Sequence, residues 1–193
     1  GKTKGEYAAI FYDSTQLILL RSSQFWLSLT PEIPGSKSWD AAITRIVTWA
    51  KFSHKISGKV FFVFNTHFDH LGKLARKESA VLLKQKVKEI AGDIPSVIMG
   101  DLNCKPFEDP ILVLTNQEDK ERFTDSREIS HTPHYGPTGT FNGFGSKERD
   151  AWPIDYIFLK GNWKVIQHAT LSQTWEGRFS SDHFPVFATI SLN

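Results

Sequence analysis

The strongest structural signal in this chain of 193 residues is the run Val60-Phe61-Phe62-Val63-Phe64-Asn65-Thr66-His67. Its first five residues are all Val or Phe, and an unbroken apolar run of this kind is typical of a strand covered on both faces. Polar residues follow at once, and functional side chains are commonly placed where strands end. The run therefore predicts a buried strand that delivers His67 to the edge of a sheet.

Other short apolar runs, separated by turn residues, indicate a protein with more sheet than helix. The alternation within residues 43–52 predicts a strand antiparallel to the one at 59–64. In residues 73–91 the apolar positions have the spacing of an amphipathic helix. Further strands are expected at residues 7–12, 16–20, 25–27, 96–99, 154–159, 163–167 and 184–190.

Composition limits the class of protein. With 40% hydrophobic and 23% charged residues, the chain can bury a core of its own, and we expect one domain over residues 1–193. A net charge of +2 is far from the basic excess of a protein that binds nucleic acid by bulk electrostatics. The single cysteine, Cys104, excludes an internal disulfide and a cysteine-rich zinc site.

The chain shows no membrane or targeting signal. It contains no window of about 18 apolar residues and no apolar stretch near Gly1 that could serve as a signal peptide. We therefore expect a soluble monomer without a membrane span, either cytoplasmic or secreted, since the absence of disulfides does not choose between compartments.

Four polar clusters lie at the ends of predicted strands. Two follow the strands at 59–64 and 96–99, and two precede the strands at 154–159 and 184–190. If the first pair of strands runs antiparallel to the second pair in neighbouring positions, all four clusters share one edge. That edge would gather His67, Asp101, Asn103, Asp155, Asp182 and His183.

This set of side chains suits a hard divalent cation. Mg²⁺ or Mn²⁺ prefers oxygen ligands and keeps several waters, so Asp and Asn beside an open position fit phosphate chemistry better than a zinc site. Asp155 could orient His183 and raise its basicity. Each cluster taken alone also fits a turn or a cap, so the functional reading depends on the four occurring together.

The motifs resemble a known series. Asn65-Thr66-His67, Gly100-Asp101-Leu102-Asn103, Ile154-Asp155-Tyr156-Ile157 and Ser181-Asp182-His183, in this order, are similar to the signature motifs of the endonuclease/exonuclease/phosphatase superfamily, which is related to DNase I-like nucleases. Residues 5–12, 25–28 and 45–50 resemble a bacterial branch of uncharacterised hydrolases. The resemblance implies an α/β fold, a four-layer sandwich of two mixed, mostly antiparallel sheets with outer helices.

The resemblance also implies roles for the polar residues. Asp101 would position or deprotonate the attacking water, and Asn103 would contact the scissile phosphate. Asp155 and His183 would form a dyad acting on the phosphate, and His67 would donate to it or protonate the leaving group.

Three further residues receive roles by the same resemblance. Asp182 would be a ligand of Mg²⁺ or Mn²⁺, Arg45 would contact phosphate as a substrate-binding residue, and Glu6 would orient His67.

One departure from the family pattern stands out. Members begin with a strand that carries a metal-site asparagine, followed by a Gln-Glu motif, and this chain has neither. Gln117-Glu118 is a superficial match in a polar stretch, and we expect a solvated loop or helix end there. Either the 193 residues are part of a longer enzyme that supplies these strands, or the protein has lost them. We favour the first explanation, because lost strands would leave raw sheet edges.

The sequence therefore predicts a divalent-metal-dependent phosphoester hydrolase, most plausibly a nuclease or phosphodiesterase. The alternatives are a phosphomonoesterase acting on a sugar or lipid phosphate and a non-catalytic phosphate-binding domain. His54, His131, His134 and His168 match no motif and are expected at the surface, and residues 140–145 are expected to form a flexible loop. Trp39, Trp152 and Trp175 fall in loops near the motifs and are candidates to line a substrate cleft.

Overall fold

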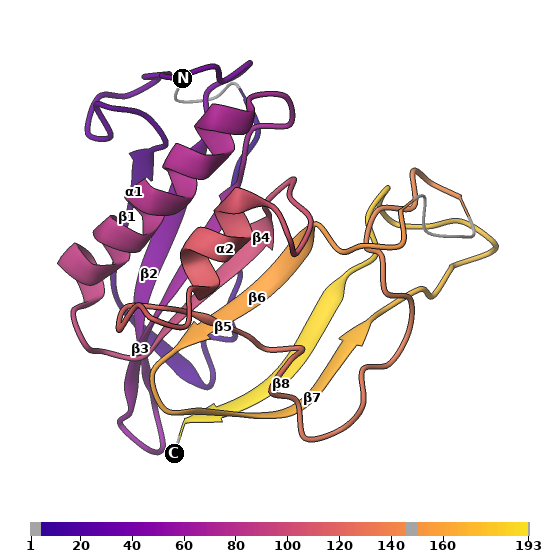
Figure 1. Ribbon diagram of the computed structural model, residues 1–193. Helices are drawn as coiled ribbons and strands as arrows, with labels where there is room; N and C mark the ends of the chain where they lie inside the picture. Colours follow the sequence, from indigo (N-terminus) through magenta and orange to yellow (C-terminus); the bar gives the residue numbers. More distant parts are fainter. Residues whose placement is uncertain (1–4, 146–149, 193) are drawn as a thin grey trace.

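The computed structural model describes residues 5–145 and 150–192. It contains a six-stranded sheet, a two-stranded sheet and two helices (Figure 1). In chain order the elements are β1 (Leu17–Trp26), β2 (Ile46–His54), β3 (Val60–His67), α1 (Lys73–Ala91), β4 (Ser96–Asp101), α2 (Asp109–Thr115), β5 (Thr124–Asp125), β6 (Asp155–Lys160), β7 (Trp163–Thr170) and β8 (Val186–Leu192).

The large sheet is mixed and has the strand order β1-β2-β3-β4-β6-β5. The pairs β1–β2 and β2–β3 are antiparallel, and β3 and β4 are parallel. Helix α1 connects these two parallel strands, as a crossover connection requires. Strand β6 then pairs antiparallel with β4, so the end of β4 lies beside the start of β6.

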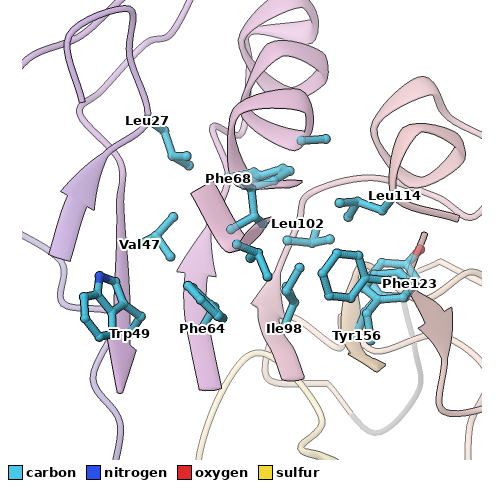
Figure 2. Packing of buried hydrophobic residues seen from close by; sticks show 14 of the residues in the cluster. Leu27, Val47, Trp49, Phe64, Phe68, Ile98, Leu102, Leu114, Phe123 and Tyr156 are labelled. Atoms are coloured by element: carbon cyan, nitrogen blue, oxygen red, sulfur yellow. The ribbon is translucent and has the colours of Figure 1, made fainter. Parts of the chain in front are cut away.

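Both helices pack on one face of the large sheet and close the main core over it. Trp49, Phe64 and Ile98 are register partners across β2, β3 and β4, and they lie in a row beneath the helices in Figure 2. Leu83 and Val87 of α1 belong to the same buried cluster. Burying each of these large side chains contributes about 1.5–3 kcal/mol relative to leaving it in water.

Helix α1 has the bounds that the periodicity of residues 73–91 predicts. Its buried positions include Ala75, Ala80 and Leu83, while most of its lysines remain at the surface. No helix within residues 5–145 and 150–192 has the length and apolar character needed to cross a membrane.

The two-stranded sheet of β7 and β8 lies against the opposite face of the large sheet (Figure 1). Val97 of β4 and Leu159 of β6 pack there with Val165 of β7, and Val63 of β3 adjoins them. The central strands are thus covered on both faces, which explains the unbroken apolar run that begins at Val60. The fold is an α/β sandwich, as the sequence predicts, and both described helices lie on the large-sheet side.

Two expectations for the secondary structure are wrong, and one helix was not expected. Residues 7–12 form no strand, and Tyr7 and Phe11 are 70% and 92% exposed. The stretches 16–20 and 25–27 belong to one continuous strand, β1, at the edge of the large sheet. The short helix α2 was not expected, because a seven-residue helix carries too little periodicity to be recognised.

Candidate active site

The register of the large sheet brings three of the predicted site residues together. His67 is the last residue of β3 and pairs in register with Asp101, the last residue of β4. Asp155 is the first residue of β6 and pairs with Asp101 from the other side. An imidazole and two carboxylates therefore lie on three adjacent strands at one edge of the sheet.

A close backbone approach accompanies this arrangement. Gly100 precedes Asp101 and has a φ of 135°, which L side chains rarely adopt. A Cβ at this position would lie 1.9 Å from the carbonyl oxygen of Thr66 in β3. Only glycine fits here, so the Gly-Asp order of the motif has a steric reason.

Asp182 and His183 reach the same edge from the second sheet. They precede β8, which pairs with β7 and not with a strand of the large sheet, so the expected neighbouring position in one sheet is wrong. The loop before β6 instead joins Asp182 and His183 to the large sheet. Phe141 bridges to His183, and the backbone N–H groups of Asn142 and Gly143 donate to the Asp182 carbonyl at 2.8 and 2.9 Å.

His183 is held between two carboxylates. Its Nδ1 lies 2.8 Å from Asp155 Oδ2, in a hydrogen bond, and its Nε2 faces Asp101 Oδ2 across 3.9 Å. The hydrogen bond to Asp155 raises the pKa of His183, although burial opposes this shift, and the charges of Asp155, Asp101 and Asp182 add to the rise. The geometry therefore favours an imidazolium whose free Nε2 points toward Asp101.

Asp101 is the centre of the cluster. Its Oδ1 accepts a hydrogen bond of 2.8 Å from the Asn103 backbone N–H, and its Oδ2 lies 3.1 Å from His67 Nε2. The Asn103 side-chain amide donates to the Phe68 carbonyl at 3.1 Å, and the backbone of Asn103 is left-handed with a φ of 49°. The turn after β4 thus fixes Asp101 and leaves the amide oxygen of Asn103 available for other contacts.

A second set of contacts links His67 to Glu6 and, through Glu6, to Arg45. Glu6 Oε2 lies 3.4 Å from His67 Nδ1 and 2.5 Å from Arg45 Nη1. Arg45 is only 7% exposed, and its Nε has no hydrogen-bond partner among the described residues. Glu6 therefore lies where it can orient His67, and Arg45 keeps an unused donor beside the cluster.

The donor set can be compared with the requirements of a divalent cation. Asp101, Asp155 and His183 each offer one ligand atom, and these atoms lie within 4.8 Å of one another. Carboxylate oxygens are the ligands that Mg²⁺ and Mn²⁺ prefer, so Asp101 and Asp155 fit either cation. Asp182 is half-buried and is not a member of this group, and its Oδ1 lies 3.4 Å from Ser181 Oγ.

The loop before β6 contains a buried residue, Thr140, that belongs to none of the four motifs. Thr140 is 1% exposed, and its hydroxyl accepts hydrogen bonds from the backbone N–H groups of Ile154 at 3.0 Å and Asp155 at 3.2 Å. Its carbonyl accepts from the N–H of Phe184 at 2.7 Å. The flexible loop expected at 140–145 is wrong for Thr140 and Asn142, both of which are buried.

One of the remaining histidines also departs from expectation, and a second lies in contact with it. His168 is 5% exposed, and its Nδ1 lies 2.9 Å from Nδ1 of His134. Burial lowers the pKa of His168 to about 4, and the charges of His134 and Arg127 add to this effect. The expected surface location is therefore wrong for His168. His131 is exposed, as expected.

Gln117 and Glu118 lie in an exposed turn after α2, which agrees with the expected solvated loop. They lie outside the cluster around Asp101. The described residues therefore do not supply the family's Gln-Glu metal motif through this dipeptide.

Comparison with known proteins agrees with the fold and the motifs. The profile of the Endonuclease/Exonuclease/phosphatase family matches residues 20–183, which is most of the chain. The chain belongs to this family, whose members act on phosphoesters.

Three solved bacterial structures resemble the chain over nearly its whole length. A family protein from Bacteroides thetaiotaomicron is 36% identical with a TM-score of 0.90, and the match covers 98% of this chain and 71% of that one. A family protein from Bacteroides vulgatus is 36% identical with a TM-score of 0.87, over 94% and 69% of the two chains. A mannosyl-6-phosphatase from Bacteroides thetaiotaomicron is 34% identical with a TM-score of 0.86, also over 94% and 69%.

Proposed function

We propose that this chain carries the reacting centre of a divalent-metal-dependent phosphoester hydrolase. The observation that supports this most strongly is His183, which is hydrogen-bonded to Asp155 at one ring nitrogen and faces Asp101 across 3.9 Å at the other. A purely structural histidine does not need its second nitrogen turned toward another carboxylate. An acid and a base on opposite sides of a small gap are what hydrolysis by water requires.

In the proposed reaction, Asp101 accepts a proton from a water molecule while the water oxygen forms a bond to phosphorus. His183, as an imidazolium, donates from Nε2 to a phosphoryl oxygen and stabilises the charge that develops there. The bond from phosphorus to the leaving oxygen breaks, and His67 gives that oxygen a proton. Asp155 keeps the His183 ring oriented throughout.

Other residues would hold the phosphate and the cation. Asn103 and Arg45 would contact phosphoryl oxygens, and Glu6 would orient His67. Asp182 would hold Mg²⁺ or Mn²⁺, since Asp101 already acts as the base and Asp155 as the partner of His183. When bound, the cation supplies charge neutralisation at the phosphate.

The proposal also concerns the class of phosphoester that the enzyme hydrolyses. The motif series by itself favours a nuclease or phosphodiesterase. A phosphomonoesterase acting on a sugar phosphate is the second candidate, because a relative 34% identical over 94% of this chain is a mannosyl-6-phosphatase. A net charge of +2 also fits a small substrate better than a long nucleic acid.

The proposal is tested by the hydrolysis of bis-p-nitrophenyl phosphate and of p-nitrophenyl phosphate by the purified chain with Mg²⁺ or Mn²⁺. We expect turnover of at least one ester, lost in EDTA and restored by adding the cation. Faster turnover of the diester supports a phosphodiesterase, and faster turnover of the monoester supports a phosphatase. A folded chain that binds inorganic phosphate but turns over neither ester would contradict the enzyme and favour the non-catalytic binding domain.

A further inference from the structure

A small cavity of about 50 Å³ opens beside His183, on the side that leads toward β8. Its wall is mostly carbon and includes Leu171, Trp175, Phe179 and Phe184. His183 is part of the same wall, so the cavity adjoins one residue of the proposed reacting centre. Polar groups in the lining include the side chains of Gln173 and Ser180.

The wall that carries Trp175 is a tight hairpin. Trp175 and Arg178 exchange two backbone hydrogen bonds of 2.9 Å each. The two residues between them, Glu176 and Gly177, both have positive φ, at 52° and 76°, which is the geometry of a type I′ turn. A glutamate in the left-handed region is unfavourable, so the surrounding hydrogen bonds must hold the turn in this form.

The floor of the cavity is anchored to the body of the protein. Phe179 packs edge-on against Phe184 with ring centroids 5.5 Å apart, and Phe184 is 2% exposed. The N–H of Leu171 donates to the Pro185 carbonyl at 2.8 Å. These contacts fix Phe179 and Leu171 beside the chain that follows His183, and the hairpin of Trp175 and Arg178 forms another part of the cavity wall.

Trp175 itself stays 67% exposed. A single exposed apolar side chain is ordinary on a protein surface. This one, however, lines the same cavity as the histidine of the Asp155–His183 pair. At about 50 Å³ the cavity is too small to enclose a whole ring, and Trp175 is an exposed apolar side chain in its wall.

We propose that Trp175 is the stacking platform for a single ring in the organic part of the substrate. The ring lies with one flat apolar face on the indole while its phosphate points to His183 and Asp101. The inference rests on the proposed function and narrows its substrate class to phosphoesters that carry such a ring. A sugar and a pyrimidine nucleoside share this chemistry, and glycerol phosphate lacks it.

The kinetic test compares glucose 6-phosphate, cytidine 5′-monophosphate and glycerol 3-phosphate as substrates. In Trp175→Ala we expect kcat/KM to fall about 10- to 100-fold for whichever ring-bearing ester is used, as is typical when a stacking side chain is removed. The kcat/KM for glycerol 3-phosphate should be nearly unaffected, and Trp175→Phe should keep most of the activity.

The matched control is Ile56→Ala, which removes another exposed apolar side chain (93%) from the β2–β3 turn. An equal loss on all three substrates, or no loss, would overturn the proposal.

A binding test separates this proposal from the proposed function. The indole N–H signal of Trp175, identified by its loss in Trp175→Phe, is followed by NMR in EDTA, where no hydrolysis is expected. Glucose 6-phosphate or cytidine 5′-monophosphate should shift the signal, and the more effective ligand identifies a sugar or a nucleoside. A shift without any turnover in the presence of metal would retain the platform and refute the hydrolase. An unmoved signal would refute the platform even if turnover is observed.

Discussion

At the scale of single residues, Asp155 controls the state of His183. The hydrogen bond between them is the largest cause of the raised pKa of His183. A reaction that needs the imidazolium keeps its rate below this pKa and loses it as the pH rises through the pKa. By the same linkage, the stability that the pair adds is fully present below the ordinary pKa of histidine and is lost as the pH rises through the folded value.

Asp155→Asn should therefore lower the pKa of His183 and move the alkaline limb of the kcat/KM profile to lower pH. The loss of charge should also reduce kcat/KM by about 10²- to 10⁴-fold at neutral pH. The pH profile and an NMR titration of the His183 ring measure the two effects. Asp93→Asn, which changes a carboxylate that is 94% exposed and pairs with Lys88, is the control. An alkaline limb that stays in place would contradict the role of Asp155.

At the scale of elements, the site depends on how β3, β4 and the loop before β6 meet. Gly100→Ala should destabilise the fold by roughly 2–5 kcal/mol, because a Cβ would meet the Thr66 carbonyl and the φ is strained. Gly58→Ala is the matched control, since its φ of 68° is also positive but nothing lies within 4 Å of the new Cβ. It should cost about 1–2 kcal/mol. Urea unfolding measures both, and equal losses would show that the contact with β3 is unimportant.

Thr140 joins the start of β6 to the chain that follows His183. Thr140→Val keeps the shape of the side chain but leaves the N–H groups of Ile154 and Asp155 without their acceptor, so the fold should lose about 1–3 kcal/mol and kcat should fall. Thr140→Ser keeps the hydroxyl and should restore most of both properties. Thermal unfolding and turnover, measured side by side, test this prediction. A valine variant as active and as stable as the wild type would contradict it.

The sequence predicts the elements well where their patterns are long or unbroken. The helix at 73–91 and the buried strand that begins near Val60 are confirmed because periodicity and burial on both faces leave a clear signal. Residues 7–12 have the same apolar composition as a strand, but they pair with no strand among the described residues. Composition alone does not show whether a partner is present.

At the scale of the whole molecule, the site joins two sheets. The sequence predicts that His67, Asp101 and Asp155 meet at one strand edge, and the register of β3, β4 and β6 confirms this placement. It does not predict that Asp182 and His183 arrive from the second sheet, because the pairing of β7 with β8 depends on contacts distant in sequence. Thr140 was missed for a related reason: its two hydrogen bonds exist only after the loop and β6 have come together.

Family membership and the α/β sandwich fold are established for the chain as a whole. His183 is the best residue to replace, because it is partly exposed, lies before β8 and belongs to neither hydrophobic cluster, so its removal should leave both clusters intact.

The most direct measurement is therefore kcat/KM for metal-dependent phosphoester hydrolysis by His183→Ala, compared with His131→Ala. His131 is an exposed histidine with no contact to the Asp101 cluster in the described residues, so its replacement controls for the loss of an imidazole. We predict a loss of about 10²- to 10⁴-fold in the His183 variant at unchanged unfolding temperature, and no loss in the His131 variant. Turnover by folded His183→Ala equal to that of the wild type would show that the reacting centre lies elsewhere.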